Sequence, residues 1–180
     1  IYIFYHMIIN SKKINTQEDT LYNNILELSR NKLLFTKFNL ADTFQNRIHL
    51  IFIHISFLFV KIKQHNHKEL YKAFYQKIFD LIFKKIEQNM REIGYGDIVI
   101  NKNMKILVKT FYNILLNCEN FRGCSLNLKK MFLCEYLVHN YMEKKANNDL
   151  LIEYFDKYQA FCFDLSSDSV LKGGLNFNYK

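Results

Sequence analysis

The histidines are the side chains from which catalysis or metal binding would first be expected. His49 and His54 are five positions apart, so on a helix they occupy different parts of the surface, unlike the zinc-binding pair of an H-E-x-x-H motif. His65 and His67 flank an asparagine in a polar turn, whereas the nuclease motif with the same letters draws its residues from separate parts of a ββα unit. A histidine such as His54 in an apolar helix is more often a core residue with satisfied hydrogen bonds. The histidines therefore predict no active site.

Charged side chains gather in the segment Met90–Asp97, which contains Arg91, Glu92 and Asp97 within eight positions. A divergent enzyme would have to bring Arg91 and Glu92 into one pocket with His54. No pair of carboxylates, nucleophile elbow or phosphate-binding loop accompanies them in the sequence. We therefore predict a protein that is not an enzyme and takes no cofactor, metal or small-molecule substrate.

Two of the five glycines, Gly94 and Gly96, stand in the same segment. A glycine pair that cradles a dinucleotide follows a strand, whereas this pair follows a predicted helix. We expect Gly94 to end that helix in a left-handed conformation, Gly96 to adopt a second unusual backbone setting, and Asp97 to organise the turn. The segment is thus predicted to be a structural elbow, in which Arg91 and Asp97 pair with groups from residues 42–54.

The cysteines lack the spacing of a metal site, because none forms C-x-x-C and no histidine lies at zinc-finger distance from a pair. They are spread over the C-terminal half of the chain. We expect buried free thiols at all four positions, Cys118, Cys124, Cys134 and Cys162.

The composition indicates a folded, helical and basic protein. Nearly half of the 180 residues are hydrophobic, 16% are aromatic and proline is absent, so helices can run long. The formal net charge of +8 fits an anionic partner such as RNA or a lipid surface, but drift in an A/T-rich coding sequence would produce it too. Lys102, Lys105 and Lys109 form a basic stripe on one predicted helix.

Helical periodicity predicts an all-α fold, with a single compact domain of about six helices. Thr16 and Asp19 form a capping box at the first helix, and Asp42–Thr43 can cap the second. Residues 44–63 are apolar on nearly every face, which is typical of a central helix covered by its neighbours. Further helices are expected over residues 68–93, from an N-cap at Asn101 to a loop over 117–125, over 126–145 and after 149, with a connector over 31–41.

The ends of the chain are expected to contribute less to the fold. Residues 1–15 are an N-terminal extension of uncertain status, residues 16–165 form the helical domain, and residues 166–180 form a loose tail. No stretch reaches the roughly 20 apolar residues of a membrane span. The strongest apolar run, residues 48–60, covers 13 positions and includes two histidines.

Two sequence blocks carry a family resemblance. The first is Asp42–Ile48 followed by His54, which is similar to a D-T-x-x-G-R-F block and an apolar run with histidine. The second is Met90–Asp97, which continues through Val99 into K-x-M-K at residues 102–105 and is similar to L-R-E-M-G-V-G-D followed by V-x-K-x-M-K. On these blocks the chain resembles the ubiquinol–cytochrome c chaperone family, the assembly factors of respiratory complex III, over roughly residues 19–145.

The sequence departs from the family pattern at several positions. Asn46 stands where glycine is usual, Ile48 where phenylalanine is usual, and Met90 where leucine is usual. The Gly-Arg pair expected soon after Phe111–Tyr112 is replaced by Asn113–Ile114, so a contact made by that arginine is not carried over.

The resemblance implies an all-α chaperone that binds newly made cytochrome b and helps it enter complex III. A client-binding protein of this kind needs a groove and exposed aromatic side chains, which the aromatic-rich helices could supply. Mitochondrial members act on the matrix side of the inner membrane with a small partner protein near the ribosomal tunnel exit. A chain this short, without an evident presequence, is more similar to a bacterial member, which would act in the cytoplasm or peripherally at the inner membrane. The residues expected to serve as motif or partner contacts are Asp42, Arg47, His54, Arg91, Glu92, Gly94, Gly96, Asp97, Lys102 and Lys105.

An alternative hypothesis is a basic helical protein that binds RNA or the ribosome and has no respiratory role. Its motivation is the net charge of +8 and the lysine stripe, which could face ribosomal RNA, anionic lipid head groups or acidic loops of the client. RNA affinity that falls steeply with salt would distinguish this hypothesis from a chaperone of cytochrome b.

Overall fold

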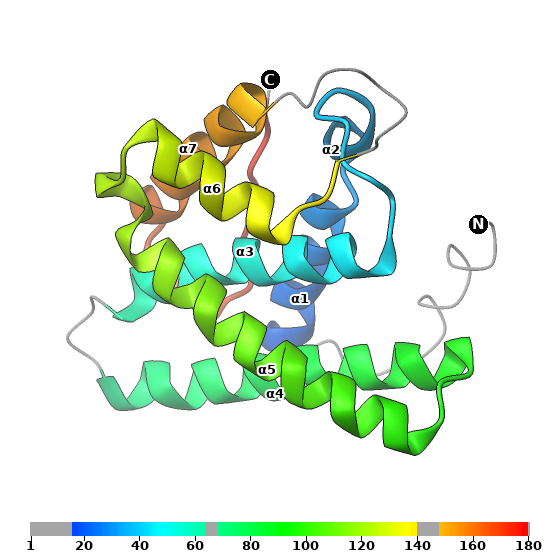
Figure 1. Ribbon diagram of the computed structural model, residues 1–180. Helices are drawn as coiled ribbons and strands as arrows, with labels where there is room; N and C mark the ends of the chain where they lie inside the picture. Colours follow the sequence, from blue (N-terminus) through cyan, green and yellow to red (C-terminus); the bar gives the residue numbers. More distant parts are fainter. Residues whose placement is uncertain (1–15, 64–67, 140–147, 180) are drawn as a thin grey trace.

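The computed structural model describes residues 16–63, 68–139 and 148–179 (Figure 1). In these ranges the fold is all-α, as predicted, and six of its helices have 11 or more residues while two have five. The elements in chain order are α1 (Gln17–Ser29), α2 (Lys32–Thr36), α3 (Phe44–Lys63), α4 (Lys68–Ile93), α5 (Asp97–Asn120), the 3₁₀ turn η2 (Phe121–Gly123), α6 (Leu126–Tyr136), α7 (Asn148–Asp164) and α8 (Ser167–Leu171).

Helix α3 is the central element, with α1, α4, α5 and α7 packed around it (Figure 1). Its side chains from residue 48 to residue 60 are all buried, because a helix that is apolar on every side must be covered by its neighbours. Aromatic rings fix its position: Phe52 meets Phe111 of α5, and Phe57 meets Phe121 of η2, each at 5.3 Å between ring centroids. The prediction of a central apolar helix over 44–63 is confirmed. None of the described helices is both long and apolar enough to cross a membrane.

Two of the predicted capped helix starts, at Thr16 and at Asp42–Thr43, are confirmed. Thr16 Oγ1 accepts a hydrogen bond from the Asp19 amide at 3.1 Å, and the Asp19 side chain returns the contact to the Thr16 amide. Thr43 Oγ1 accepts a hydrogen bond from the Asn46 amide at 3.2 Å and so caps the start of α3. These contacts satisfy amide groups that the first turn of a helix leaves without a partner.

Helix α5 is longer at both ends than the pattern predicts. It begins at Asp97 rather than after Asn101, and it runs to Asn120 through the start of the predicted loop 117–125. The cause is the buried face of α5, which starts at Ile100 and continues at helical spacing to Cys118. The β-branched run Ile98–Ile100 gave no local sign of this helix start.

Two other segments differ from their predicted form. The connector over 31–41 contains the short helix α2, capped by Asn31. Helix α6 ends at Tyr136, whereas a helix over 126–145 was expected, and the chain then forms an isolated antiparallel bridge between His139 and Leu40. The remainder of that predicted helix, like His65 and residues 1–15, lies outside the described residues.

The C-terminal tail is packed against the domain, contrary to the expectation that residues 166–180 are loose. After α8, Leu175 and Tyr179 are buried, as is Val170 within α8. Gly173 has φ +76° and lies so close to α1 that an added Cβ would meet its backbone at 2.9 Å. Asn24 of α1 donates from Nδ2 to the Gly173 carbonyl oxygen at 2.7 Å. The tail therefore lies against α1 at Gly173, and further on its rings Phe177 and Tyr179 pack against Tyr154 of α7, at 5.6 and 5.2 Å between ring centroids.

Candidate functional site: the start of α3 and the α4–α5 elbow

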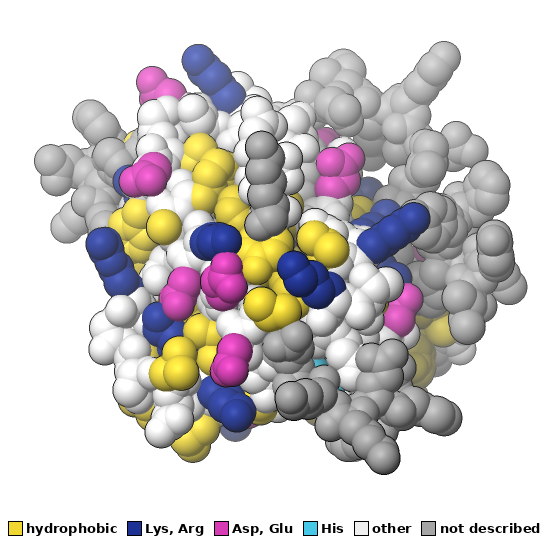
Figure 2. All heavy atoms as spheres, turned by 90° about the horizontal axis from the view of Figure 1, so that it is seen from above, with side chains coloured by type: hydrophobic (Ala, Val, Ile, Leu, Met, Phe, Trp, Pro, Cys, Tyr) yellow, Lys and Arg dark blue, Asp and Glu magenta, His cyan; other side chains and the backbone are white. Residues whose placement is uncertain are grey.

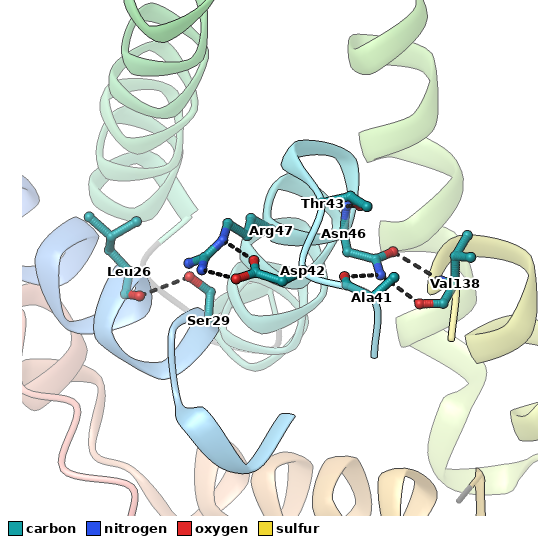
Figure 3. A network of polar contacts seen from close by, with 8 residues as sticks. All are labelled: Leu26, Ser29, Ala41, Asp42, Thr43, Asn46, Arg47 and Val138. Atoms are coloured by element: carbon teal, nitrogen blue, oxygen red, sulfur yellow. Dashed lines mark hydrogen bonds and ion pairs between the residues drawn. The ribbon is translucent and has the colours of Figure 1, made fainter. Parts of the chain in front are cut away.

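Asn46 in the first turn of α3 joins two distant parts of the chain (Figure 3). Its side-chain nitrogen Nδ2 donates to the carbonyl oxygens of Ala41 and Val138, both at 2.7 Å, and its Oδ1 accepts from the Val138 amide at 2.9 Å. The side chain is fully buried. One amide group thus ties the segment after α6 to the start of α3. The sequence marked this position only as a departure from glycine, since the partner lies 92 residues away.

Asp42 and Arg47 form a two-pronged ion pair beside this network (Figure 3). Arg47 donates from Nε to one carboxylate oxygen of Asp42 at 2.7 Å and from Nη2 to the other at 2.9 Å. Its guanidinium also lies 5.0 Å from the ring centroid of Phe35 in α2. Both partners are partly exposed, so the pair orders the entry to α3 and leaves a charged surface there.

His54 is a core residue. It is completely buried, and its Nδ1 lies 2.6 Å from the carbonyl oxygen of Leu50. Because a carbonyl only accepts, Nδ1 carries the proton, and Nε2 then accepts from the Tyr154 hydroxyl of α7 at 2.8 Å. Burial lowers the pKa of His54 to about 4, since the charged imidazolium loses its hydration. The residue thus holds α3 to α7 as a neutral imidazole.

The elbow between α4 and α5 is a Schellman turn. The Gly94 amide donates to the Arg91 carbonyl at 3.0 Å, and the Tyr95 amide donates to the Met90 carbonyl at 3.1 Å. Gly94 has φ +99°, the left-handed setting that was predicted for it. The second prediction is wrong, because Gly96 has an ordinary extended conformation with φ −72° and ψ 157° and serves as the N-cap of α5.

Arg91 closes this elbow with two carboxylates. It donates from Nη1 to Asp97 at 2.5 Å and from Nη2 to Glu87 at 2.9 Å. The predicted pairing of Arg91 and Asp97 with residues 42–54 is therefore wrong: both belong to a local ion cluster with Glu87, which joins the last turns of α4 to the start of α5. Glu92 is also exposed. The geometry keeps Asp97 at the N-terminus of α5, where the helix dipole favours a negative charge.

The elbow presents apolar side chains to the outside. Ile93 and Tyr95 are 45% and 44% exposed, and Ile98 and Val99 in the first turn of α5 are 87% and 45% exposed. Four large apolar side chains exposed within seven residues of chain are unusual on a surface that has no binding partner. We refer to Ile93, Tyr95 and Val99 as the elbow cluster.

The candidate residues do not assemble into a catalytic centre. His54 lies inside the core against α7, whereas Arg91 and Glu92 lie on the exposed elbow, so the three do not share a pocket. In the described ranges, no group of three or more His, Cys, Asp or Glu side chains could hold a metal ion. Lys102 and Lys105 are exposed on α5. They belong neither to the Asp42–Arg47 ion pair nor to the ion cluster of Arg91.

The prediction for the cysteines is confirmed in part. Cys118 and Cys162 are buried free thiols, and burial raises the pKa of both. Cys124 is partly exposed and Cys134 is exposed, so the expectation of burial is wrong for Cys134.

An open cavity of about 550 Å³ lies where the end of α3 meets the start of α4 and the end of α5. Its walls include Phe59, Tyr75 and Leu115. Lys63 and Glu119 also line it and pair with each other at 2.7 Å. Burial raises the pKa of Tyr75 to about 12, because the phenolate would lose its hydration in this apolar setting. Because most of its walls are apolar, the cavity is suited to bind apolar groups.

The sequence and fold of this chain are similar to those of known proteins. The chain matches the family model described as ubiquinol-cytochrome C chaperone over residues 36–177. It is 21% identical over 167 residues to the ubiquinol-cytochrome c reductase complex assembly factor 1 of Mus musculus, an alignment that covers 90% of this chain and 54% of that protein. The chain thus spans about half the length of this curated relative.

A solved structure shares the fold. The crystal structure of the Cbp3 homolog from Brucella abortus superposes with a TM-score of 0.76 at 21% identity, over 91% of this chain and 89% of that one. The family match includes both the start of α3 and the elbow, the two places where the motif residues were predicted to lie. The chain belongs to the ubiquinol–cytochrome c chaperone family.

Proposed function

We propose that this protein is a non-catalytic assembly chaperone, which binds newly made cytochrome b and assists its entry into the ubiquinol–cytochrome c reductase complex. The family match over residues 36–177 is the observation that carries the proposal. The name of the mouse relative, an assembly factor of the same complex, agrees with it. A chaperone needs surfaces for apolar segments, and the described residues offer such surfaces without a catalytic constellation.

The elbow cluster is our candidate for the client contact. Ile93, Tyr95 and Val99 are exposed, while the turn beneath them is held by the Schellman hydrogen bonds and by the ion pairs of Arg91. A pre-ordered apolar tip loses little conformational entropy on binding, which favours contact with a hydrophobic client. The cavity beside Phe59 and Tyr75 can accept a further apolar side chain of the client.

Deletion of the gene tests the family function directly. We expect lower steady-state cytochrome b and less assembled complex III in membranes of the native host, with recovery on re-expression of the intact protein. Normal levels of both would refute the proposal.

A triple variant, Ile93→Ser, Tyr95→Ser and Val99→Ser, tests the proposed contact. These side chains are exposed, so the fold should be retained, whereas co-purification of cytochrome b after crosslinking should fall. The matched control replaces Leu126, Leu128 and Met131 of α6, which are also exposed, by serine. Equal loss of cytochrome b co-purification in both variants, or no loss in either, would show that the elbow cluster is not the contact.

We place the protein at the membrane face on which complex III is assembled, the cytoplasmic face in a bacterium or the matrix face in a mitochondrion.

A further inference from the structure

The outward side of α5 carries one continuous stripe of side chains. Positions 98, 102, 105, 109, 112 and 116 recur at alternating spacings of four and three, which aligns them along one side of a helix. The buried side of the same helix runs separately through Ile100, Leu107 and Phe111. We name the outward set the α5 stripe; its members are Ile98, Lys102, Lys105, Lys109, Tyr112 and Leu116.

All six members of the α5 stripe are exposed. The apolar members are unusually open, with Ile98 at 87% and Leu116 at 58% exposure, and Ile106 beside the stripe is 53% exposed. Between Asp97 and Glu119 the helix contains no acidic residue. The stripe therefore combines three positive charges with aliphatic and aromatic groups and no negative charge between them.

The distribution of charge on the α5 stripe differs from that on another face of the molecule, the one seen when the view of Figure 1 is turned to look from above. There, acidic and basic side chains are interspersed around the hydrophobic ones (Figure 2). Mixed charge of this kind is ordinary for a solvated surface. The α5 stripe lies between Asp97 and Glu119 and carries only positive charge beside its exposed aliphatic side chains, which calls for a partner that is both anionic and apolar.

We propose that the α5 stripe docks the protein on a membrane surface that contains anionic phospholipid. A helix lying in the interface places lysines among lipid phosphates and sinks neighbouring apolar side chains into the acyl boundary. Ile98 and Leu116 are 18 positions apart, about 27 Å along the helix, so they can insert at both ends while the three lysines bind head groups between them. RNA would use the lysines but offers no apolar phase for Ile98, Ile106 and Leu116. This inference does not rest on cytochrome b being the client.

Vesicle flotation of the purified protein tests the proposal. We expect the protein to float with vesicles of phosphatidylcholine and phosphatidylglycerol, and to stay behind with phosphatidylcholine alone. The variant Lys102→Gln, Lys105→Gln, Lys109→Gln should bind the anionic vesicles on the order of 100-fold more weakly, because each lysine near such a surface contributes roughly fivefold. The charge-matched control changes Lys72, Lys84 and Lys172, which are also exposed, to glutamine and should bind as the parent protein does.

The apolar half of the stripe is tested separately. The variant Ile98→Ser, Leu116→Ser keeps every charge, and it should lose vesicle binding that survives at raised salt in the parent protein, since insertion is not screened by ions. Equal flotation with neutral and anionic vesicles, unchanged binding in the triple lysine variant, or unchanged binding in Ile98→Ser, Leu116→Ser would each overturn the proposal. Binding of single-stranded RNA through the same lysines without binding of vesicles would overturn it as well.

Discussion

Arg91, near the end of α4, donates to Asp97, the first residue of α5, with 2.5 Å between Nη1 and the carboxylate oxygen. The same guanidinium also binds Glu87 one turn earlier in α4. One side chain therefore joins the last turn of one long helix to the first turn of the next. The side chains of Arg91 and Asp97 are 51% and 74% exposed, so this contact orders the elbow without adding to the buried core.

Replacing Arg91 by alanine should loosen the elbow locally. We expect faster hydrogen exchange of the amides around Tyr95 and Val99, with little change in the melting temperature, because exposed ion pairs contribute little to global stability. Lys157→Ala removes another exposed pair, with Glu153 on α7, and should leave exchange at the elbow unchanged. A large fall in the melting temperature of Arg91→Ala would mean that Arg91 supports the core instead.

The two glycines of the elbow should respond differently to substitution. Gly94→Ala forces a side chain into a backbone with φ +99° and should cost roughly 1–2 kcal/mol of unfolding free energy. Gly96→Ala is the matched control, since its φ of −72° suits any residue and an added Cβ meets no atom within 4 Å. Urea denaturation of both variants provides the comparison. Equal destabilisation would show that the positive φ of Gly94 does not set the cost of its substitution, because an added Cβ has open space at both positions.

Local patterns in the sequence identified the elements whose causes are local. Thr16 and Thr43 cap helices through residues three positions away, and Gly94 ends α4 through bonds within its own turn. The apolar surface of α3 on every side required a central place in the fold. These features depend on a few consecutive residues, so a single sequence contains all the information needed to predict them.

Features that depend on distant partners could not be predicted in this way. The sequence marks Asn46 only as a departure from the family's glycine, because its partner Val138 lies 92 residues away, and the burial of Tyr179 includes a ring contact with the distant Phe38. The opposite error occurred at Arg91, for which a distant partner was expected although two nearby carboxylates satisfy it. Charged residues on an exposed turn pair with their neighbours because few other groups are within reach.

Asn46 should contribute measurably to stability. Asn46→Ala removes both hydrogen bonds donated by Nδ2 and leaves the Val138 amide without its acceptor, so we expect a loss of about 1–3 kcal/mol in unfolding free energy. Gln45→Ala changes an exposed neighbour and should alter stability by no more than about 0.5 kcal/mol. If Asn46→Ala were as stable as the control, water would have to satisfy the freed groups fully.

His54 should make the protein less stable in mild acid. Its pKa is about 4 in the folded state and 6.5 when exposed, so below pH 6.5 the unfolded chain binds a proton that the folded chain does not. Stability contributed by the neutral imidazole is present above pH 6.5, falls as the pH drops toward 4, and is constant below that. At pH 5 the loss is about 2 kcal/mol relative to pH 7.

Substitution of His54 separates this effect from other titrations. In His54→Gln the decline of unfolding free energy between pH 7 and pH 5 should be shallower than in the parent protein, although the variant is less stable at pH 7 because Tyr154 loses its acceptor. Some slope should remain, since burial also lowers the pKa of His49. Denaturation series at several pH values measure both quantities. An unchanged slope in His54→Gln would show that His54 gains its proton without unfolding, and the packing of α3 against α7 would then have to open below pH 6.5.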